Sequence, residues 1–229
     1  MHRFPPEFAD LLSPRGRRFT GPPADPFFAD AGLIEPAKAK AVFGLLERAL
    51  GPVVRPMAHA IPPESITGQT RNYQERLPKT VRVKTADIDA ARTKAARIAG
   101  EIGLTDMMRS PSYIEFASKL AGRALDPTFG RQVLRYGQGD YAGPHTDHHP
   151  EEPRAKRGYF DLHLTFAGGR AARQLLVYAK DGHLSETVDI AVPGGVTAYR
   201  LPFWHYTTPL EGKSTQAARW VVLGTFLYA

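Results

Sequence analysis

The chain has 229 residues, of which 42% are hydrophobic, so it can bury a substantial core in one domain or two. Thirty Lys and Arg residues against 23 Asp and Glu residues give a net charge of +7, which favours anionic partners such as acidic metabolites or nucleotides. The absence of cysteine excludes disulfides, thiolate metal sites and a cysteine nucleophile, so any metal must be held by nitrogen and oxygen ligands.

Targeting and membrane segments are not indicated by the sequence. The opening stretch MHRFPPEFADLLSPRGRRF lacks the continuous apolar region of a secretory signal, and nowhere do about 18 apolar residues run together. We therefore expect a cytoplasmic, soluble protein that makes no membrane contact. Nothing in the sequence indicates an oligomeric state.

Apolar residues recur at helical spacing in three segments of the first half. The first predicted helix covers about 36–50, and the second, about 88–102, follows the acidic stretch TADID and closes at Gly103. The third covers 111–122, with Ser110 as its N-cap. Residues 51–80 hold five prolines and little periodicity, which predicts a loop; loops of this kind often contact substrate. The roles of residues 1–35 and 51–80 cannot be predicted further.

The pattern changes near residue 130 to short β-like runs punctuated by glycine and proline. The eight predicted strands are RQVLRYG, DYAGPHTD, GYFDLHLTFAG, RQLLVYA, ETVDIAV, GVTAYRLP, HYTTPL and ARWVVLGTFLY. The Asp-Gly pair in KDGH, residues 180–183, predicts a tight hairpin. Eight strands without intervening helices predict an antiparallel sandwich or barrel, so the fold class is mostly β with α, and the helices cover one face of the larger sheet.

One histidine-rich stretch, YGQGDYAGPHTDHHPEEP, carries the first candidate site residues. In an extended segment residues i and i+2 point to the same side, so His145 and Asp147 can present an imidazole and a carboxylate together. His205 follows at the edge of a later predicted strand, and Arg219 lies on the last strand. Two histidines and one carboxylate on one face, with open positions opposite, form the facial triad of non-haem Fe(II) oxygenases. We treat His148 and His149 as loop residues.

The order His145-x-Asp147, His205, Arg219, within RYGQGDYAGPHTD and PGGVTAYRLPFWHYTTPL, resembles the Fe(II)/2-oxoglutarate-dependent dioxygenases and, within them, the prolyl-hydroxylase-like group. The resemblance covers about residues 130–229. It implies a double-stranded β-helix, or jelly roll, of two facing sheets, which agrees with the strand count. We expect a single domain spanning 1–229, in which residues 1–129 form an N-terminal extension with supporting helices and residues 130–229 form the catalytic core.

The resemblance also implies roles for individual residues. His145, Asp147 and His205 would be the iron ligands. Arg219 would hold the distal carboxylate of 2-oxoglutarate, because a guanidinium stays charged and offers a planar, bidentate fork. Tyr136 would donate a hydrogen bond to the same cosubstrate.

Some relatives place a Ser or Thr two residues after the arginine, where this chain has Val221, so another hydroxyl must share the carboxylate, or none does. Tyr136, Thr165 and Tyr199 are the candidates. Independently of the resemblance, Asp161, His163 and Thr165 share one face of a predicted strand whose other face is apolar. If that apolar face packs on the helices, these three residues line the cavity, as contacts to the substrate or to the metal ligands.

The activity implied by the resemblance is hydroxylation of an unactivated C–H bond, with Fe(II) as metal and 2-oxoglutarate and O2 as cosubstrates. Asp147 favours hydroxylation over halogenation, because related halogenases have a small residue there; desaturation and cyclisation stay open, as do regiochemistry and stereochemistry. The expected substrate is a small molecule, acidic or amino-acid-like, or a natural-product precursor. The alternatives are a peptidyl residue such as proline, and a non-catalytic, cupin-like metal-binding domain. The missing second arginine between Arg219 and Ala229 argues against a nucleic-acid substrate.

Overall fold

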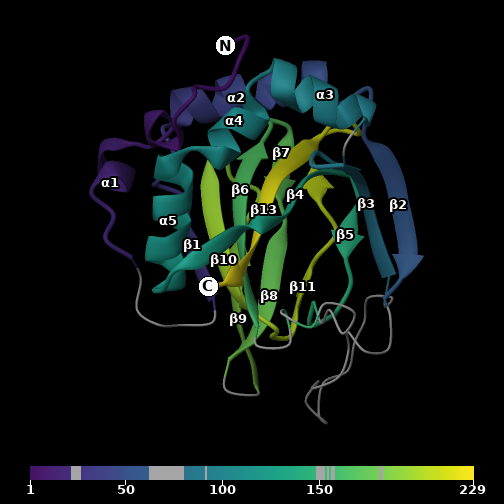
Figure 1. Ribbon diagram of the computed structural model, residues 1–229. Coiled ribbons are helices and arrows are strands. Elements are labelled where there is room, and N and C mark those ends of the chain that lie inside the picture. Colours follow the sequence, from purple (N-terminus) through teal and green to yellow (C-terminus); the bar gives the residue numbers. More distant parts are fainter. Residues whose placement is uncertain are drawn as a thin grey trace.

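The computed structural model describes residues 1–21, 27–61, 80–90, 92–147, 153, 155, 158–180 and 183–229. Within these residues the chain forms mostly antiparallel β-structure with a few helices (Figure 1). The helices are the 3-10 helix η1 (Phe8–Asp10), α1 (Pro14–Arg17), α2 (Pro36–Ala49), α3 (Lys94–Glu101), α4 (Leu104–Arg109) and α5 (Pro111–Ala121). The strands are β1 (Phe27–Asp30), β2 (Arg55–Ala60), β3 (Thr80–Asp87), β4 (Leu125–Gly137), β5 (Tyr141–Ala142), β6 (Tyr159–Ala167), β7 (Ala171–Arg173), β8 (Leu175–Lys180), β9 (His183–Asp189), β10 (Gly195–Leu201), β11 (His205–Thr207), β12 (Glu211–Gly212) and β13 (Ala218–Tyr228).

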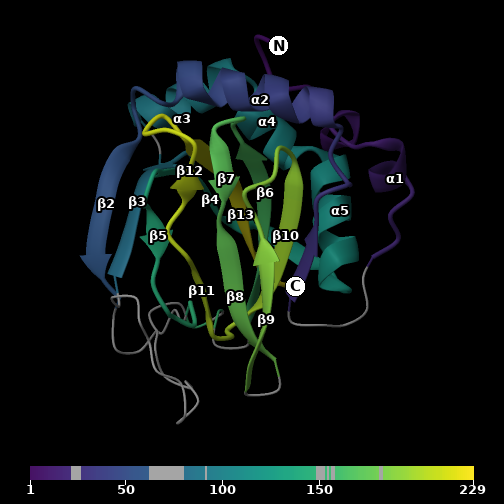
Figure 2. The ribbon, with the colours of Figure 1, turned by 180° about the vertical axis from the view of Figure 1, so that it is seen from behind.

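Two sheets face each other and form the jelly-roll core. The larger sheet has the order β1-β10-β6-β13-β4-β3-β2, with β5 paired to β3, and the smaller sheet has the order β11-β8-β9. The smaller sheet lies in front of the larger one in Figure 2. β7 pairs with β12 in a separate two-stranded sheet. This arrangement confirms the predicted fold class.

The main core lies between the helices and the outer face of the larger sheet. On β6 the alternate residues Phe160, Leu162, Leu164 and Phe166 are buried in one cluster with the inward residues of α2, α4 and α5. A fully buried side chain of this size contributes about 1.5–3 kcal/mol to stability. Because side chains alternate along a strand, the same packing turns Asp161 and the other polar residues of β6 toward the smaller sheet. The helix-covered face predicted for the larger sheet is therefore confirmed.

Two of the predicted helices have the expected bounds, and one starts later than expected. α2 covers Pro36–Ala49 and α5 covers Pro111–Ala121, with the Ser110 side chain accepting from the Tyr113 amide. The helix predicted from about residue 88 begins only at Lys94, capped by Thr93. Its expected first turn is instead the end of β3 and a turn in which the Asp87 carboxylate accepts from the amides of residues 89 and 90.

Three strands that the sequence did not predict precede residue 125. β1 pairs with β10, and β2 and β3 extend the other end of the larger sheet beyond β4. The segment predicted as a loop over 51–80 thus contains β2, while residues 62–79 lie outside the described part of the chain. The predicted strand over residues 140–147 is strand only at Tyr141 and Ala142. The hairpin predicted at KDGH is confirmed by the pairing of β8 with β9, in which Lys180 lies opposite His183.

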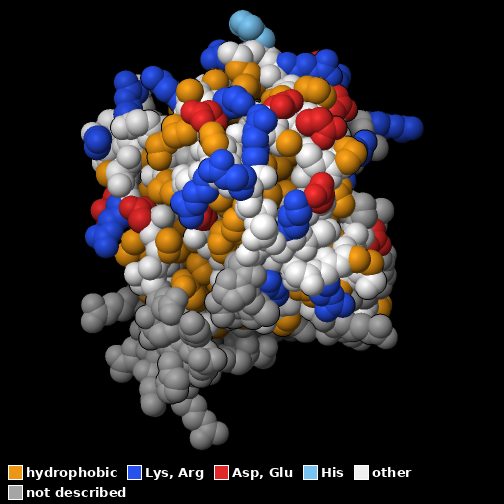
Figure 3. Space-filling model, turned by 90° about the vertical axis from the view of Figure 1, so that its left-hand side faces the viewer, with side chains coloured by type: hydrophobic (Ala, Val, Ile, Leu, Met, Phe, Trp, Pro, Cys, Tyr) orange, Lys and Arg blue, Asp and Glu red, His pale blue; other side chains and the backbone are white. Residues whose placement is uncertain are grey.

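The molecular surface on the α1 and α5 side mixes charges of both signs. Figure 3 shows basic side chains beside acidic ones and among hydrophobic ones on this face. Arg15 pairs with Asp30, and Lys119 pairs with Glu115 at 2.7 Å. No helix in the described part of the chain is long and apolar enough to cross a membrane. The cytoplasmic location stays a prediction.

Ser110 offers a test of how the helical layer is held together. Its buried hydroxyl accepts from the amides of Phe8 at 3.2 Å and Tyr113 at 3.3 Å, and donates to the Met107 carbonyl at 2.8 Å. Ser110→Ala removes the side-chain cap of α5 and leaves the buried Phe8 amide without its partner, so we expect a loss of about 1–2 kcal/mol in the free energy of unfolding, measured in urea. Thr93→Ala is the matched control: it removes an exposed cap of α3 and should cost less. Equal losses in the two variants would contradict this prediction.

Candidate functional site

A backbone bridge brings the two candidate histidines together. The His145 amide donates to the His205 carbonyl at 3.0 Å, and the His205 amide donates to the His145 carbonyl at 2.9 Å. Residues that exchange both hydrogen bonds in an antiparallel pair lie directly opposite and present their side chains on the same face. The two imidazole rings accordingly lie 4.5 Å apart, centroid to centroid.

Asp147 reaches the same point through a turn and not through strand alternation. Its backbone has φ of +50°, in the left-handed region that aspartate tolerates better than most residues. The Tyr159 hydroxyl donates to the Asp147 carbonyl and fixes this turn to the start of β6. The expectation that His145 and Asp147 lie on one face of a strand is therefore wrong. The two side chains nevertheless converge, as expected.

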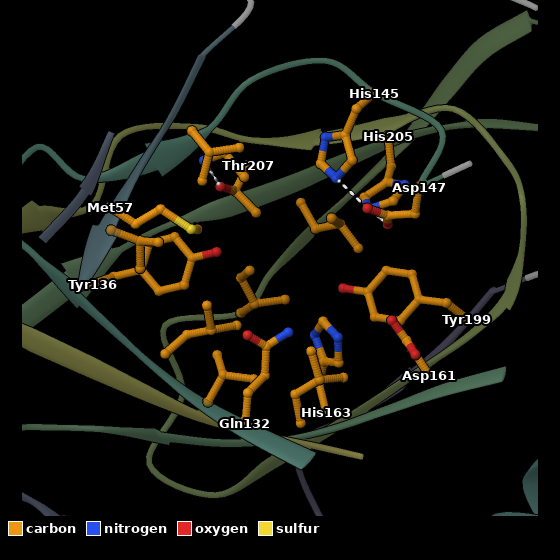
Figure 4. A pocket seen from close by; sticks show the side chains of 18 of the residues that line it. Met57, Gln132, Tyr136, His145, Asp147, Asp161, His163, Tyr199, His205 and Thr207 are labelled. Atoms are coloured by element: carbon orange, nitrogen blue, oxygen red, sulfur yellow. Dashed lines mark hydrogen bonds and ion pairs between the residues drawn. The ribbon is translucent and has the colours of Figure 1, made fainter. Parts of the chain in front are cut away.

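The three side chains present their ligand atoms to one another. Asp147 Oδ1 lies 2.9 Å from His145 Nε2, and Asp147 Oδ2 lies 3.1 Å from His205 Nε2 (Figure 4). His145 Nδ1 lies 2.6 Å from the Gly143 carbonyl, and His205 Nδ1 lies 3.0 Å from the Phe203 carbonyl. A carbonyl only accepts, so each Nδ1 carries a proton, and Nε2 is the ring atom that each histidine directs toward Asp147 and would offer to a metal.

This donor set fits a divalent metal. One atom from each of the three residues can be chosen so that all lie within 4.8 Å of one another. Neighbouring ligands of a six-coordinate metal with bonds of about 2.1 Å are separated by about 3.0 Å, close to the distances between the imidazoles and the carboxylate. The carbonyls behind both rings are the outer partners that orient a metal-bound histidine.

Electrostatics favour the ionised form of Asp147. Burial opposes its charge, but the neighbouring His145 and His205 outweigh this and hold the pKa of Asp147 well below its ordinary value. Burial likewise opposes a proton on His145, whereas Asp147 and the Gly143 carbonyl raise the pKa of His145 above its ordinary value. The two shifts describe one mutual attraction, which a cation at the same point would replace.

The triad opens into a cavity of about 630 Å³ between the two sheets. Its walls are largely apolar, with side chains such as Met57, Val83 and Leu134, and Arg219 lies in the wall. The Arg219 side chain is buried, with 2% of its surface exposed. Burial opposes the charge of Arg219 and lowers its pKa, so the guanidinium needs hydrogen-bonding partners or a counter-charge.

Three neighbours orient the Arg219 guanidinium. Its Nε donates to Gln174 Oε1 at 2.7 Å, and its Nη1 donates to Thr165 Oγ1 at 3.4 Å. Its carbon Cζ lies 4.3 Å from the centre of the Tyr136 ring. A guanidinium has five N–H donors, so these contacts set its plane while leaving donors for an anion in the cavity. Thr165 and Tyr136 are thus the candidate hydroxyls beside Arg219.

Most of the other residues predicted for the site line the same cavity, but Thr165 does not: it lies beside Arg219 and is not part of the cavity wall. Asp161, His163 and Tyr199 line it together with Tyr136 (Figure 4). Burial, and next the positive Arg219, lower the pKa of His163 to about 3, so the ring is neutral near neutral pH. Burial raises the pKa of Asp161 to about 8, against a hydrogen bond from Thr225, and the charge of Asp147 raises it further. His148 and His149 lie outside the described residues.

Gln174 is the site residue that the sequence did not reveal. Its side chain is fully buried and its Nε2 donates to the carbonyls of Thr208 at 2.9 Å and Asp140 at 3.2 Å, while its Oε1 receives Arg219. The only local signal is a polar residue at the start of the apolar run QLLVYA. Gln132 and Thr225, which line the cavity itself, carry no signal beyond strand alternation.

Comparison with known proteins supports the fold. No family model and no curated protein sequence matches the chain. Among solved structures, the chain is similar to a prolyl-4-hydroxylase from Pseudomonas putida, with 14% identity over 89% of this chain and 93% of that chain and a TM-score of 0.54. It is similar to the non-heme alpha-ketoglutarate-dependent epimerase SnoN from nogalamycin biosynthesis, with 17% identity over 90% and 79% of the two chains and a TM-score of 0.54.

A third similar structure is EvdO2 from Micromonospora carbonacea var. aurantiaca, complexed with 2-oxoglutarate. Here the identity is 13% over 90% of this chain and 87% of that chain, with a TM-score of 0.52. The chain therefore has the fold of the Fe(II)/2-oxoglutarate-dependent oxygenases. At the level of the fold, this confirms the resemblance that the sequence motifs indicated.

The raised pKa of Asp161 predicts how stability depends on pH. Its folded-state pKa of about 8 lies above the ordinary value of 3.8, so the folded state binds more protons between these values and loses stability as pH rises through that range. Asp161→Asn removes this titration. The variant should gain stability relative to the wild type as pH rises from about 5 to about 9, by on the order of a few kcal/mol.

Thermal unfolding across that pH range measures the effect. Asp106→Asn is the control, because Asp106 is 59% exposed and pairs with Arg3 on the surface. A difference between Asp161→Asn and wild type that does not change with pH would contradict the prediction.

Proposed function

We propose that the protein is an Fe(II)- and 2-oxoglutarate-dependent dioxygenase that hydroxylates an unactivated C–H bond of a small molecule. The observation that carries the proposal is the convergence of His145, Asp147 and His205 in a cavity that also holds the buried Arg219. The similar fold of SnoN, whose structure has been described in complex with Fe3+ and alpha ketoglutarate, supports the same assignment.

His145, Asp147 and His205 would hold the iron. Their arrangement supplies two neutral nitrogens and one carboxylate from one side, and the cavity leaves the opposite side open to ligands. The Gly143 and Phe203 carbonyls keep both rings in the metal-binding tautomer, so no ring must reorient when the metal arrives. When bound, Fe(II) supplies the chemistry that couples O2 and the conversion of 2-oxoglutarate to succinate and carbon dioxide with C–H oxidation.

Arg219 would bind the distal carboxylate of 2-oxoglutarate. Its permanent charge and planar fork suit a carboxylate, and burial strengthens the attraction because water is excluded. Thr165 accepts a hydrogen bond from the guanidinium, and Tyr136 packs on it. These contacts would fix the cosubstrate in one orientation beside the triad.

The cavity favours a small molecule as substrate. Its walls are largely apolar, so an apolar substrate body is stabilised by burial there. Hydroxylation of a peptidyl residue is the second candidate, supported by the similar fold of the prolyl-4-hydroxylase and by the exposed edge strand β2, beside which a peptide could lie. A non-catalytic metal-binding domain is disfavoured, because it would have no use for a buried arginine held by Gln174 and Thr165.

The assignment of His145 and His205 as iron ligands can be tested by measuring Fe(II) binding in substituted variants. His145→Ala and His205→Ala should each lose tight Fe(II) binding and 2-oxoglutarate turnover, because two ligands do not hold the ion as three do. Binding is measured without oxygen through the weak visible absorption that Fe(II) and 2-oxoglutarate give together, and turnover is measured as succinate release. His2→Ala, at an exposed histidine near the chain start, is the control. Retained turnover in either site variant would remove the assignment.

Arg219 is tested by its conservative replacement. Arg219→Lys keeps the charge and loses the fork, so the concentration of 2-oxoglutarate needed for half-maximal absorption should rise about tenfold or more. Arg97→Lys, at an exposed arginine on α3, should leave that concentration unchanged. Unchanged affinity in Arg219→Lys and in Arg219→Ala would show that another group binds the cosubstrate.

A further inference from the structure

We infer that Asp161 is the substrate-recognition residue of the cavity and that it binds a protonated amine on the substrate. The inference rests on the proposed function and adds a substrate class to it. Asp161 lies on β6 and lines the same cavity as the triad and Arg219. Figure 4 shows its carboxyl group beside Tyr199, directed toward the interior of the cavity.

The Asp161 side chain is buried and only partly satisfied. It retains 8% of its surface, and its Oδ1 has no hydrogen-bond partner among the described residues. Its register partner on β13, Thr225, supplies a hydrogen bond to the carboxyl group. Burying a carboxyl group is costly when its hydrogen-bonding capacity is unmet, so such a group in a ligand cavity is explained by a ligand that completes it.

The charges of the filled cavity indicate what that ligand is. Among the described residues that line the cavity, the carboxylates are Asp147 and Asp161 and the guanidinium is Arg219. Fe(II) and Arg219 together carry three positive charges, which Asp147 and the two carboxylates of 2-oxoglutarate balance. When Asp161 ionises, its charge is the one that has no counter-charge in the filled cavity. An ammonium group on the substrate would supply it.

The groups facing Asp161 do not supply that counter-charge themselves. His163, two residues along β6, is neutral near neutral pH because burial and Arg219 lower its pKa to about 3. Tyr199, its register partner on β10, has a pKa raised by burial and is also neutral. Asp147 adds a negative charge on the same side of the cavity. With two neutral neighbours and one negative one, the surroundings of Asp161 favour a cation over an anion.

The other groups whose pKa values respond to the charge of Asp161 lie on the other side of the sheet. Tyr113 on α5 and Tyr228 at the end of β13 both have pKa values raised by burial, and the charge of Asp161 raises both further. The nearby cations Arg131, Arg123 and Arg200 lower these tyrosine pKa values, and none of them lines the cavity. The cation that completes Asp161 must therefore come through the cavity.

Binding of an amine should release a proton from the site, whereas binding of a neutral ligand should not. The pKa of Asp161 of about 8 means that the empty site is protonated at neutral pH. An ammonium ion pairs with the ionised carboxylate, so its binding releases the carboxyl proton to the buffer. A hydroxyl in the same place leaves that proton where it is.

The experiment compares amines with alcohols of the same shape. The protein is loaded with Fe(II) and 2-oxoglutarate without oxygen and titrated calorimetrically with matched pairs of alkyl, aralkyl and cyclic compounds, such as 2-phenylethylamine and 2-phenylethanol. Two buffers with different heats of ionisation give the number of protons released. We expect at least one amine to bind about tenfold or more tightly than its alcohol and to release up to one proton at neutral pH, with less released above about pH 8.

Asp161→Asn should abolish both the preference for the amine and the proton release, whereas Asp106→Asn should keep both. If no amine in the panel binds more tightly than its alcohol, or if the preference survives in Asp161→Asn, the inference is wrong. If Asp161→Asn does not fold, the proton release of the wild type decides, since amine binding without proton release also overturns the inference. If Fe(II) and 2-oxoglutarate together give no visible absorption with the wild-type protein, the proposed function itself is wrong.

Discussion

The pair of backbone hydrogen bonds between His145 and His205 joins two segments that are distant in the sequence, and the candidate metal site depends on this junction. One histidine lies in an irregular segment after β5, and the other begins β11 of the smaller sheet. Once the two backbones are paired, the rings must lie side by side, and the left-handed turn at Asp147 brings a carboxylate between them. The site is therefore built from main-chain geometry, with the side chains needing little adjustment.

The order of chemistry-bearing residues along the chain is what sequence reasoning could use. The fold class, two of the three helices and most of the strands after residue 130 followed from periodicity and turn residues. The convergence of His145, Asp147, His205 and the cavity around Arg219 was foreseen from their order in the sequence and their resemblance to a family, although the turn that places Asp147 was not.

Other elements carry no local signal, because tertiary contacts decide them. β2, Arg55–Ala60, contains a proline and is largely exposed, so it lacks the apolar alternation by which a strand is recognised. The late start of α3 depends on the Asp87 carboxylate, which caps a turn where a helix was expected. The state of Asp161 likewise depends on burial and on its neighbours, neither of which a sequence pattern reveals.

Gln174 has a consequence for how costly it is to bind an anion at Arg219. A free arginine side chain samples many rotamers, and freezing them at the moment of binding costs about 2 kcal/mol. Here the Gln174 side chain links the guanidinium to the carbonyls of Asp140, just before β5, and Thr208, just after β11. The entropy is thus lost during folding, and a carboxylate that bound at Arg219 would meet a side chain that is already rigid.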